Sequence, residues 1–349
     1  MAYVTPSDPL LTFAAYGGLA VLFATVALLA AIAAIRYLVD RRLAAERRLN
    51  KLWLPVFFGV IEGLPVTPPR ISARDREAVL MAWIQSTESI RGEARSRLRR
   101  FALDLGFDRT ARELLTKSNM RARLLAIAAM GRLGMSSSWD DLAVLGHDET
   151  PTISLLAMRS LLQIDAVRGV PLLFRMLHWH AEWPASKVAA MLGDVPHDLL
   201  GAELADAIRT ARPDVLARLL KVADLQQAGD LWPVLEPLLD GSRQEEVIIG
   251  ALKASDDPRS IDAIRRLVID SRWTVRAQAA AALGRLGLPE DRLRLQAMLA
   301  DPDWWVRYRA AQALVRLPSS RRADLEALCV RLGDHPSRDM LRQALAEAA

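Results

Sequence analysis

Two stretches of the sequence, 31 residues apart, decide the fold. The first reads DSRWTVRAQAAAALGRL over residues 270–286, and the second reads DPDWWVRYRAAQALVRL over residues 301–317. Asp, Trp, Val, Arg, Ala and Leu recur at matching positions of the two stretches. From Val275 to Leu286 the apolar residues are spaced by 4, 4 and 3 positions, which places them on one face of a helix. Each stretch therefore predicts one amphipathic helix.

The same 31-residue frame extends over most of the chain. Apolar residues fit it backward to Ala126 and forward to Leu345, and a second apolar segment precedes most of the predicted helices. Pro and Gly residues separate the units. One helix pair cannot bury its apolar face alone, so such pairs stack. The sequence predicts an all-α protein, an α-solenoid of about nine helix pairs over residues 72–349.

These residues also carry a resemblance to a known family. The pattern Asp-x-x-x-x-Val-Arg-x-x-Ala-Ala-x-Ala-Leu-Gly-Arg-Leu-Gly is strongest at residues 270–287, and it is recognisable at 301–317 and 117–134. It resembles the HEAT repeats of the bacterial lyase-like form. The resemblance implies a non-catalytic binding scaffold. It also implies a hydrogen-bonded ladder between repeats, for which the matching residues are Asp270, Arg276, Asp301 and Arg307.

The N-terminal segment has a different composition. The stretch 9–35 contains no charged residue, and as a helix it would measure about 40 Å, more than the ~30 Å hydrocarbon core of a bilayer. Basic residues follow it at 36–51. Together with an Arg- and Ala-rich composition typical of GC-rich bacterial genomes, this predicts a single-pass anchor at 1–38 in a bacterial inner membrane. The N-terminus would lie outside and the solenoid in the cytoplasm.

Residues 39–71 are interpreted as a basic juxtamembrane segment followed by an interfacial stretch rich in Pro and aromatic residues. The basic part, 36–51, could lie along anionic lipid headgroups. Small residues form a stripe on the predicted anchor helix. The stripe could dock on a partner membrane helix, or it could simply reflect the general abundance of Ala in the sequence. The stripe consists of Gly17, Ala20, Ala24, Ala27, Ala31 and Ala34.

Two sets of residues are candidates for binding a partner protein. Turn positions are usually exposed, so Trp at turns favours a contact surface, although each Trp could instead cover its neighbouring repeat. These residues are Trp183, Trp273, Trp304 and Trp305. Basic residues on the second helices could line a groove for an acidic peptide, or could simply form surface ion pairs. These residues are Arg159, Lys221, Lys253, Arg285, Arg309 and Arg316.

Several classes of site lack sequence support. A single cysteine, Cys329, excludes a disulfide scaffold and any site with several thiolate ligands. His178 and His180 would point to different sides of a helix, which does not favour a metal site. The sequence contains neither a Gly-rich phosphate loop nor a Gly-x-Ser-x-Gly motif. We therefore predict no cofactor, no metal and no enzymatic activity.

The predicted function is a membrane-anchored scaffold. Its cytoplasmic solenoid would position a protein partner, including an integral membrane protein, within an enzyme or transport assembly such as a polysaccharide-synthesis or secretion complex. A HEAT-like nucleic-acid-binding protein or DNA glycosylase is an alternative, but residues 101–349 carry a net charge of −1, which argues against it. A chromophore-lyase-type chaperone and a ligand-binding sensor are further alternatives.

Overall fold

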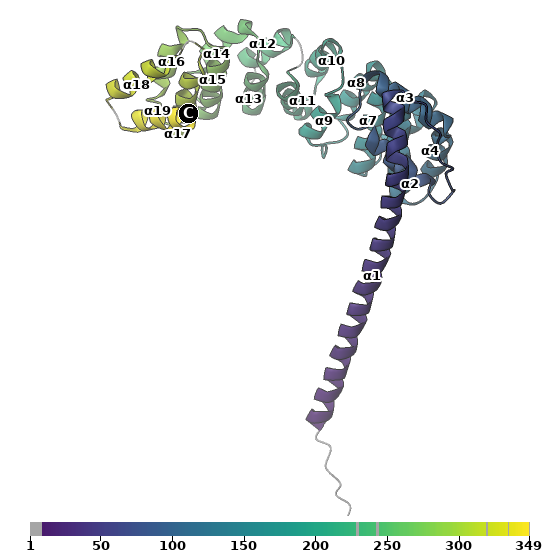
Figure 1. The fold of residues 1–349 in the computed structure, drawn as a ribbon. Helices are drawn as coiled ribbons and strands as arrows, with labels where there is room; N and C mark the ends of the chain where they lie inside the picture. Colours follow the sequence, from purple (N-terminus) through teal and green to yellow (C-terminus); the bar gives the residue numbers. More distant parts are fainter. Residues whose placement is uncertain (1–8, 228–229, 242–243, 319, 334, 349) are drawn as a thin grey trace, which may run out of the picture. The chain divides into compact units, whose positions relative to one another are not determined.

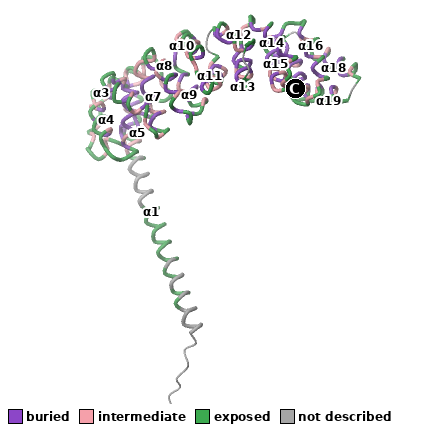
Figure 2. Tube along the Cα trace, turned by 180° about the vertical axis from the view of Figure 1, so that it is seen from behind, coloured by how far each residue is buried: buried purple, intermediate pink, exposed green. Residues whose placement is uncertain are grey.

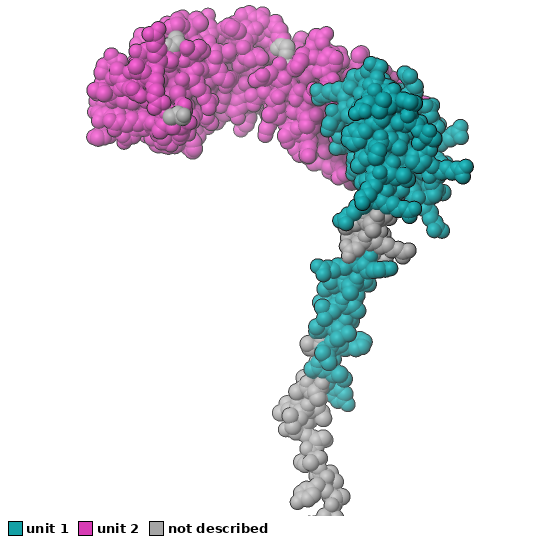
Figure 3. Space-filling model, viewed as in Figure 1, with its two compact units in different colours: residues 1–133 teal, residues 134–349 magenta. Residues whose placement is uncertain are grey.

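The computed structural model describes residues 9–227, 230–241, 244–318, 320–333 and 335–348, and all regular elements in this part of the chain are helical. A long helix, α1 (Pro9–Glu62), comes first, and eighteen α-helices, α2 to α19, follow it (Figure 1). Eighteen helices within the described residues agree with the predicted nine pairs. The chain divides into two compact units, residues 1–133 and 134–349, which Figure 3 distinguishes by colour.

Unit 1 has its core where the end of α1 packs against α2 and α3. Trp83 of α2 is fully buried, and its indole Nε1 donates a hydrogen bond to the Leu98 carbonyl of α3 at 3.1 Å. Its ring meets Phe107 edge-on, with 6.1 Å between the ring centroids. After α1 the helices of this unit are α2 (Arg76–Ser86), α3 (Gly92–Asp104), α4 (Phe107–Leu115) and α5 (Met120–Leu133).

The last turns of α1 belong to this core. Trp53 and Phe57 are each 1% exposed, and Phe57 packs edge-on against Phe101 of α3. The helix continues through Pro55. The interpretation of this stretch as interfacial does not hold for Trp53 and Phe57, because they bury against helices of their own chain, whereas Phe58 is exposed.

The predicted membrane anchor at 1–38 is also wrong. Among the residues that the structure describes, no helix has both the length and the apolar character that crossing a bilayer requires. In the structure the apolar stretch 9–35 belongs to α1, which runs without a break through the charged residues 36–51 to Glu62. The predicted location in the inner membrane and the predicted orientation both depended on the anchor, so they are withdrawn as well. Figure 2 shows much of the described part of α1 before its last turns as exposed.

Unit 2 is a stack of helix pairs. The two helices contact each other in every pair of this unit other than α8 and α9, and the second helices α7, α9, α11, α13, α15, α17 and α19 also contact one another in succession. In Figure 1 the first helices α12, α14 and α16 lie along one side of the unit, and the second helices α13, α15 and α17 along the other. This is the two-layer arrangement of an α-solenoid.

The helix bounds of unit 2 follow the predicted frame. They are α6 (Trp139–Leu145), α7 (Pro151–Ile164), α8 (Ala166–Met176), α9 (Ala185–Leu192), α10 (His197–Thr210), α11 (Pro213–Gln226), α12 (Trp232–Gly241), α13 (Glu245–Ala254), α14 (Ile261–Leu267), α15 (Trp273–Leu286), α16 (Asp291–Met298), α17 (Trp304–Arg316), α18 (Arg322–Arg331) and α19 (His335–Glu347). Two short 3-10 helices, η1 (Ser136–Ser138) and η2 (Pro258–Ser260), precede α6 and α14.

The core of unit 2 contains the residues that the 31-residue period predicted. Val275, Ala279 and Leu283 of α15 have no exposed surface, and Val306, Ala310 and Leu314 of α17 match them. Small residues bring these two helices close together. A Cβ placed on Gly284 would lie 2.7 Å from the Cα of Ala313, so a side chain there would push α17 away.

Candidate functional site

The repeats of α15 and α17 are joined by a ladder of charged hydrogen bonds. The guanidinium of Arg276 donates to both carboxylate oxygens of Asp301, at 2.8 and 2.9 Å. The same guanidinium donates to the carbonyl of Asp270 at 2.9 Å, and Arg307 repeats this bond to the carbonyl of Asp301 at 2.8 Å. The ladder that the resemblance implied is present at all four residues.

The carboxylates of the ladder have lowered pKa values. Burial by itself raises the pKa of Asp301, but the hydrogen bond from Arg276 and the backbone N–H of Asp303 outweigh it, so the pKa lies below its ordinary value. The pKa of Asp270 is also lowered, chiefly by the side-chain hydrogen bond from Arg272. Both carboxylates therefore contribute to stability as anions, and their role is structural.

Exposed aromatic residues gather at the start of α15 and α17. Trp273 and Trp304 are the first residues of these two neighbouring helices, and they are 43% and 41% exposed. Trp305 follows and is 51% exposed. Together with the half-buried Tyr308 these residues form what we call the aromatic ridge. Three of the four Trp residues selected from the sequence are thus exposed, and their binding of a partner stays a prediction.

Three rings of the aromatic ridge, those of Trp304, Trp305 and Tyr308, pack on one another. Trp304 stacks on Tyr308 with 5.2 Å between centroids and 11° between planes, and Trp305 stands at 88° to Trp304 at 4.8 Å. The Asp303 carboxylate caps α17 by accepting a hydrogen bond from the Trp305 backbone N–H at 2.9 Å.

Tyr308 extends the ridge toward α19. Its hydroxyl donates to the Glu347 carboxylate at 3.1 Å and accepts a hydrogen bond from the Gln312 amide at 2.8 Å. The hydrogen bond to Glu347 raises the pKa of Tyr308. Sequence analysis did not select Tyr308. Its position four residues after Trp304, on the same face of the helix, is the signal that could have found it.

Trp183 is not part of any surface. It is 1% exposed, stacks on the His180 ring at 4.3 Å between centroids, and donates from its indole to the Ser154 hydroxyl at 3.2 Å. His180 is itself held by the Gly146 carbonyl at 2.8 Å, and Arg218 donates to the Trp183 carbonyl at 3.0 Å. The prediction that Trp183 binds a partner is therefore wrong, because this turn folds back against α7.

The six basic residues predicted to line a groove fall into two groups. Arg285 donates to the Leu252 carbonyl at 2.9 Å, where it caps the end of α13, and burial lowers its pKa. All six side chains are exposed, so their binding of a partner stays a prediction, although the Arg285 guanidinium is already engaged in this cap. Arg309 donates to the amide oxygen of Gln312 at 3.1 Å, next to the aromatic ridge. The other four are Arg159, Lys221, Lys253 and Arg316.

The small-residue stripe on α1 is described only in part. The side chains of Gly17, Ala20 and Ala24 lie outside the described residues. Ala27, Ala31 and Ala34 are exposed.

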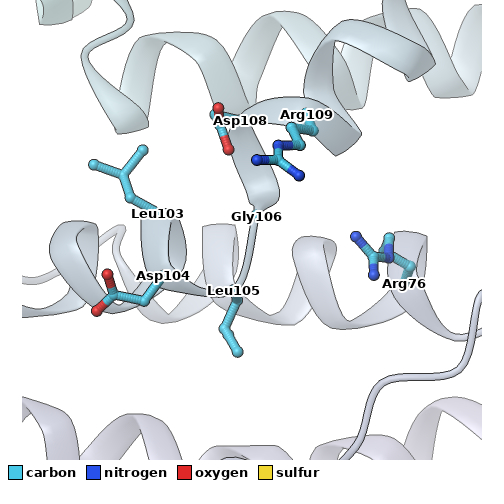
Figure 4. Close-up of a pocket in the computed structure, with 7 residues that line it drawn as sticks. All are labelled: Arg76, Leu103, Asp104, Leu105, Gly106, Asp108 and Arg109. Atoms are coloured by element: carbon cyan, nitrogen blue, oxygen red, sulfur yellow. The ribbon is translucent and has the colours of Figure 1, made fainter.

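Unit 1 contains an open pocket of about 440 Å³ at the turn between α3 and α4. Arg76 and Arg109 contribute positive charge to its lining, and Asp104 and Asp108 contribute negative charge. In Figure 4, Leu103 and Asp104 lie on one side of the turn at Gly106, and Arg76 lies on the other. The lining therefore carries two positive and two negative side chains, and its charges do not favour a ligand of one sign.

The His and Cys candidates are part of the fold. His180 is 6% exposed and uses both ring nitrogens, one with Gly146 and one with the Glu182 carboxylate at 2.6 Å. Cys329 is buried, and burial raises the pKa of its thiol, which disfavours the reactive thiolate. Among the described residues no His, Cys, Asp and Glu side chains cluster as metal ligands.

Comparison with known proteins supports the architecture. The model of the family described as HEAT repeats matches residues 233–315 and 270–349, which include the ladder and the aromatic ridge. The search of curated proteins found no match. HEAT repeats are generally non-catalytic and usually mediate contacts between proteins. The segment 233–349 of this chain is therefore built of HEAT repeats.

Proposed function

We propose that the chain is a non-catalytic scaffold, and that its HEAT repeats bind a partner protein through the aromatic ridge. One observation carries this proposal. Trp304 and Trp305 are 41% and 51% exposed, yet ring packing and the Asp303 cap hold them in place. Large aromatic side chains that are both exposed and rigid are typical of binding surfaces.

The energetics of binding favour such a surface. A partner that covers Trp304 and Trp305 gains the burial of large apolar rings, at about 25 cal/mol per Å². Because the rings are already fixed, little side-chain entropy remains to be lost on binding. Arg309, exposed on the same helix, adds a cation beside the rings, and Arg is also frequent among residues that dominate binding energy.

The proposed partner is a protein, and the proposal does not depend on a membrane. The expectation of an integral membrane protein, and of a polysaccharide-synthesis or secretion complex, depended on the anchor and loses its basis with it. What remains is a partner protein with an apolar patch that fits a raised aromatic surface. Charge complementarity with Arg309 favours carboxylates at the edge of that patch.

The test compares partner recovery between matched variants. The tagged full chain is purified from its own cells, and co-purifying proteins are quantified by mass spectrometry for the wild type, for the double variant W304A/W305A and for W179A. Trp179 is 76% exposed but lies outside the aromatic ridge, so it controls for the loss of any exposed Trp.

We expect W304A/W305A to lose at least one specific partner by tenfold or more, while W179A retains it. Far-UV circular dichroism must show that both variants keep their helical content. If the double variant recovers the same proteins in the same amounts as the wild type, the aromatic ridge is not the binding surface.

A further inference from the structure

The segment that links α1 to α2 has an unusual backbone. It contains Pro65, Pro68 and Pro69, each with φ fixed near −65°. The residues before each proline are also confined to extended conformations, so Leu64 and Thr67 are restricted as well. The segment has no helix or strand, and the described residues form no cis peptide bond. These restrictions favour a polyproline II helix over residues 64–70.

Side-chain burial in this segment repeats every three residues, which is the period of polyproline II. Val66 and Pro69 are half-buried, and the Cγ1 of Val66 packs so closely on α1 that a Cβ on Gly59 would meet it at 2.6 Å. The other two edges face outward. One edge carries Pro65 and Pro68, and the second carries Thr67 and Arg70, all of them exposed.

Both ends of the segment are fixed to the body of unit 1. At its start, Gly63 has φ +79°, and the N–H groups of Gly63 and Leu64 donate to the carbonyls of Val60 and Gly59, which is the Schellman ending of a helix. At its end, the Ser72 hydroxyl donates to the Asp75 carboxylate at 2.7 Å, where α2 begins. The extended segment is therefore held in place before any ligand arrives.

Arg97 of α3 reinforces the first of these ends. Its guanidinium donates to the Ile61 carbonyl at 2.6 Å and to the Glu93 carboxylate at 2.7 Å. One of the unpaired carbonyls at the end of α1 thus gains a charged partner. In contrast, none of the described residues pairs with the Arg70 guanidinium, which stays exposed at the other end of the segment.

We propose that residues 64–70 are a ligand segment that docks in the aromatic-lined groove of a partner protein of the SH3 type. The exposed order is Pro65-x-x-Pro68-x-Arg70. Pro65 and Pro68 stand one turn apart on one edge and would fill two neighbouring slots between aromatic rings. Arg70 would pair with a carboxylate at the end of the groove, which fixes the direction in which the segment lies. Preorganisation removes most of the entropy cost of ordering the segment.

This proposal is independent of the aromatic ridge. The segment belongs to unit 1, and the ridge belongs to unit 2. A scaffold that carried both could engage two partners, but either contact can exist without the other. Variants in one can therefore be tested without reference to the other.

The test uses the full-length chain and, as probe, a purified SH3 domain selected for Pro-x-x-Pro-x-Arg ligands. Isothermal titration calorimetry measures binding to the wild type, P68A and R70E. The matched controls are T67A, on the edge next to the prolines, and R74E, which reverses an exposed arginine just beyond the segment. All of these side chains are exposed, so circular dichroism should show unchanged folding.

We expect binding to the wild type, at least tenfold weaker binding for P68A and R70E, and changes of less than twofold for T67A and R74E. A synthetic peptide of residues 63–72 should displace the full chain from the probe, which tests the segment even if a variant fails to fold. Failure of the wild type to bind, or equal binding by P68A and R70E, would overturn the proposal.

Discussion

Replacing Arg276 with alanine removes the side chain that joins α15 to the turn before α17. Four hydrogen bonds disappear, two to the Asp301 carboxylate and one each to the carbonyls of Asp270 and Ser271. The Arg276 and Asp301 side chains are only 14% and 10% exposed, so the carboxylate stays largely buried without its cation. Breaking a buried pair costs about 3–5 kcal/mol. Because the Asp303 N–H still donates to Asp301, we expect the lower end, about 3 kcal/mol.

The loss is local, since a repeat contacts only its neighbours. Hydrogen–deuterium exchange with mass spectrometry measures it directly, because amide exchange in α15 and α17 reports the free energy of local opening. A loss of about 3 kcal/mol corresponds to roughly a hundredfold faster exchange, at 1.4 kcal/mol for each factor of ten. Exchange in α7 and α8, several repeats away, should not change.

The matched control is R259A. Arg259 pairs with Asp230 at 2.6 Å and with Asp257 at 2.5 Å, but its side chain is 53% exposed, so solvent screens these pairs. We expect its exchange profile to match the wild type. If α15 and α17 exchange at the wild-type rate in R276A, or if R259A has an equal effect, the ladder does not hold these repeats together.

Three further outcomes follow from the core and from the ladder. The pKa of Asp301 is lower in the folded protein than in the unfolded chain, where it is near 3.8, so the Asp301 anion stabilises the fold. This stabilisation is complete above the unfolded pKa and is lost as the pH falls through the lower native pKa. In an acid titration followed by circular dichroism, the stability of D301N should therefore depend less on pH below about pH 4 than that of the wild type. G284A should lower the free energy of unfolding in urea by about 1–3 kcal/mol because its Cβ meets the α17 backbone, whereas G241A, with open space around it, should not. W183A should lower the free energy of unfolding by about 3–5 kcal/mol because it truncates a buried side chain, whereas W305A should change it by no more than about 0.5 kcal/mol. Equal melting temperatures of the two variants would contradict the assignment of Trp183 to the core.

The repeats could be predicted because they depend on local periodicity. Spacings of 3 and 4 residues fix which face of α15 and α17 is buried, and the 31-residue offset fixes that the two helices are neighbours. The ladder residues Arg276 and Asp301 came from the resemblance to HEAT repeats. These features need no knowledge of distant contacts.

Features that depend on distant contacts could not be predicted in the same way. Trp183 occupies a turn, but it is buried by its stacking on His180 and by Ser154, 29 residues earlier in the chain. Arg285 matches a groove position, yet its guanidinium bonds to Leu252 in the previous repeat. Trp53 and Phe57 are apolar residues beside a proline, and only their packing on α3 shows that they belong to the core.

The full extent of α1 could not be predicted from composition either, since the helix begins in the uncharged stretch 9–35 and continues to Glu62. The linker at 64–70 was interpreted as part of an interfacial stretch. Its period-three burial becomes visible once the position of Val66 against Gly59 is known.

The binding role of the aromatic ridge is tested most directly by site-specific photo-crosslinking in living cells. A benzophenone amino acid replaces Trp305 in one variant and Trp179, outside the ridge, in another. We expect position 305 to form a crosslink to one defined protein and position 179 to form none with that protein. Crosslinking of the same proteins from both positions, or of none from position 305, would contradict the account.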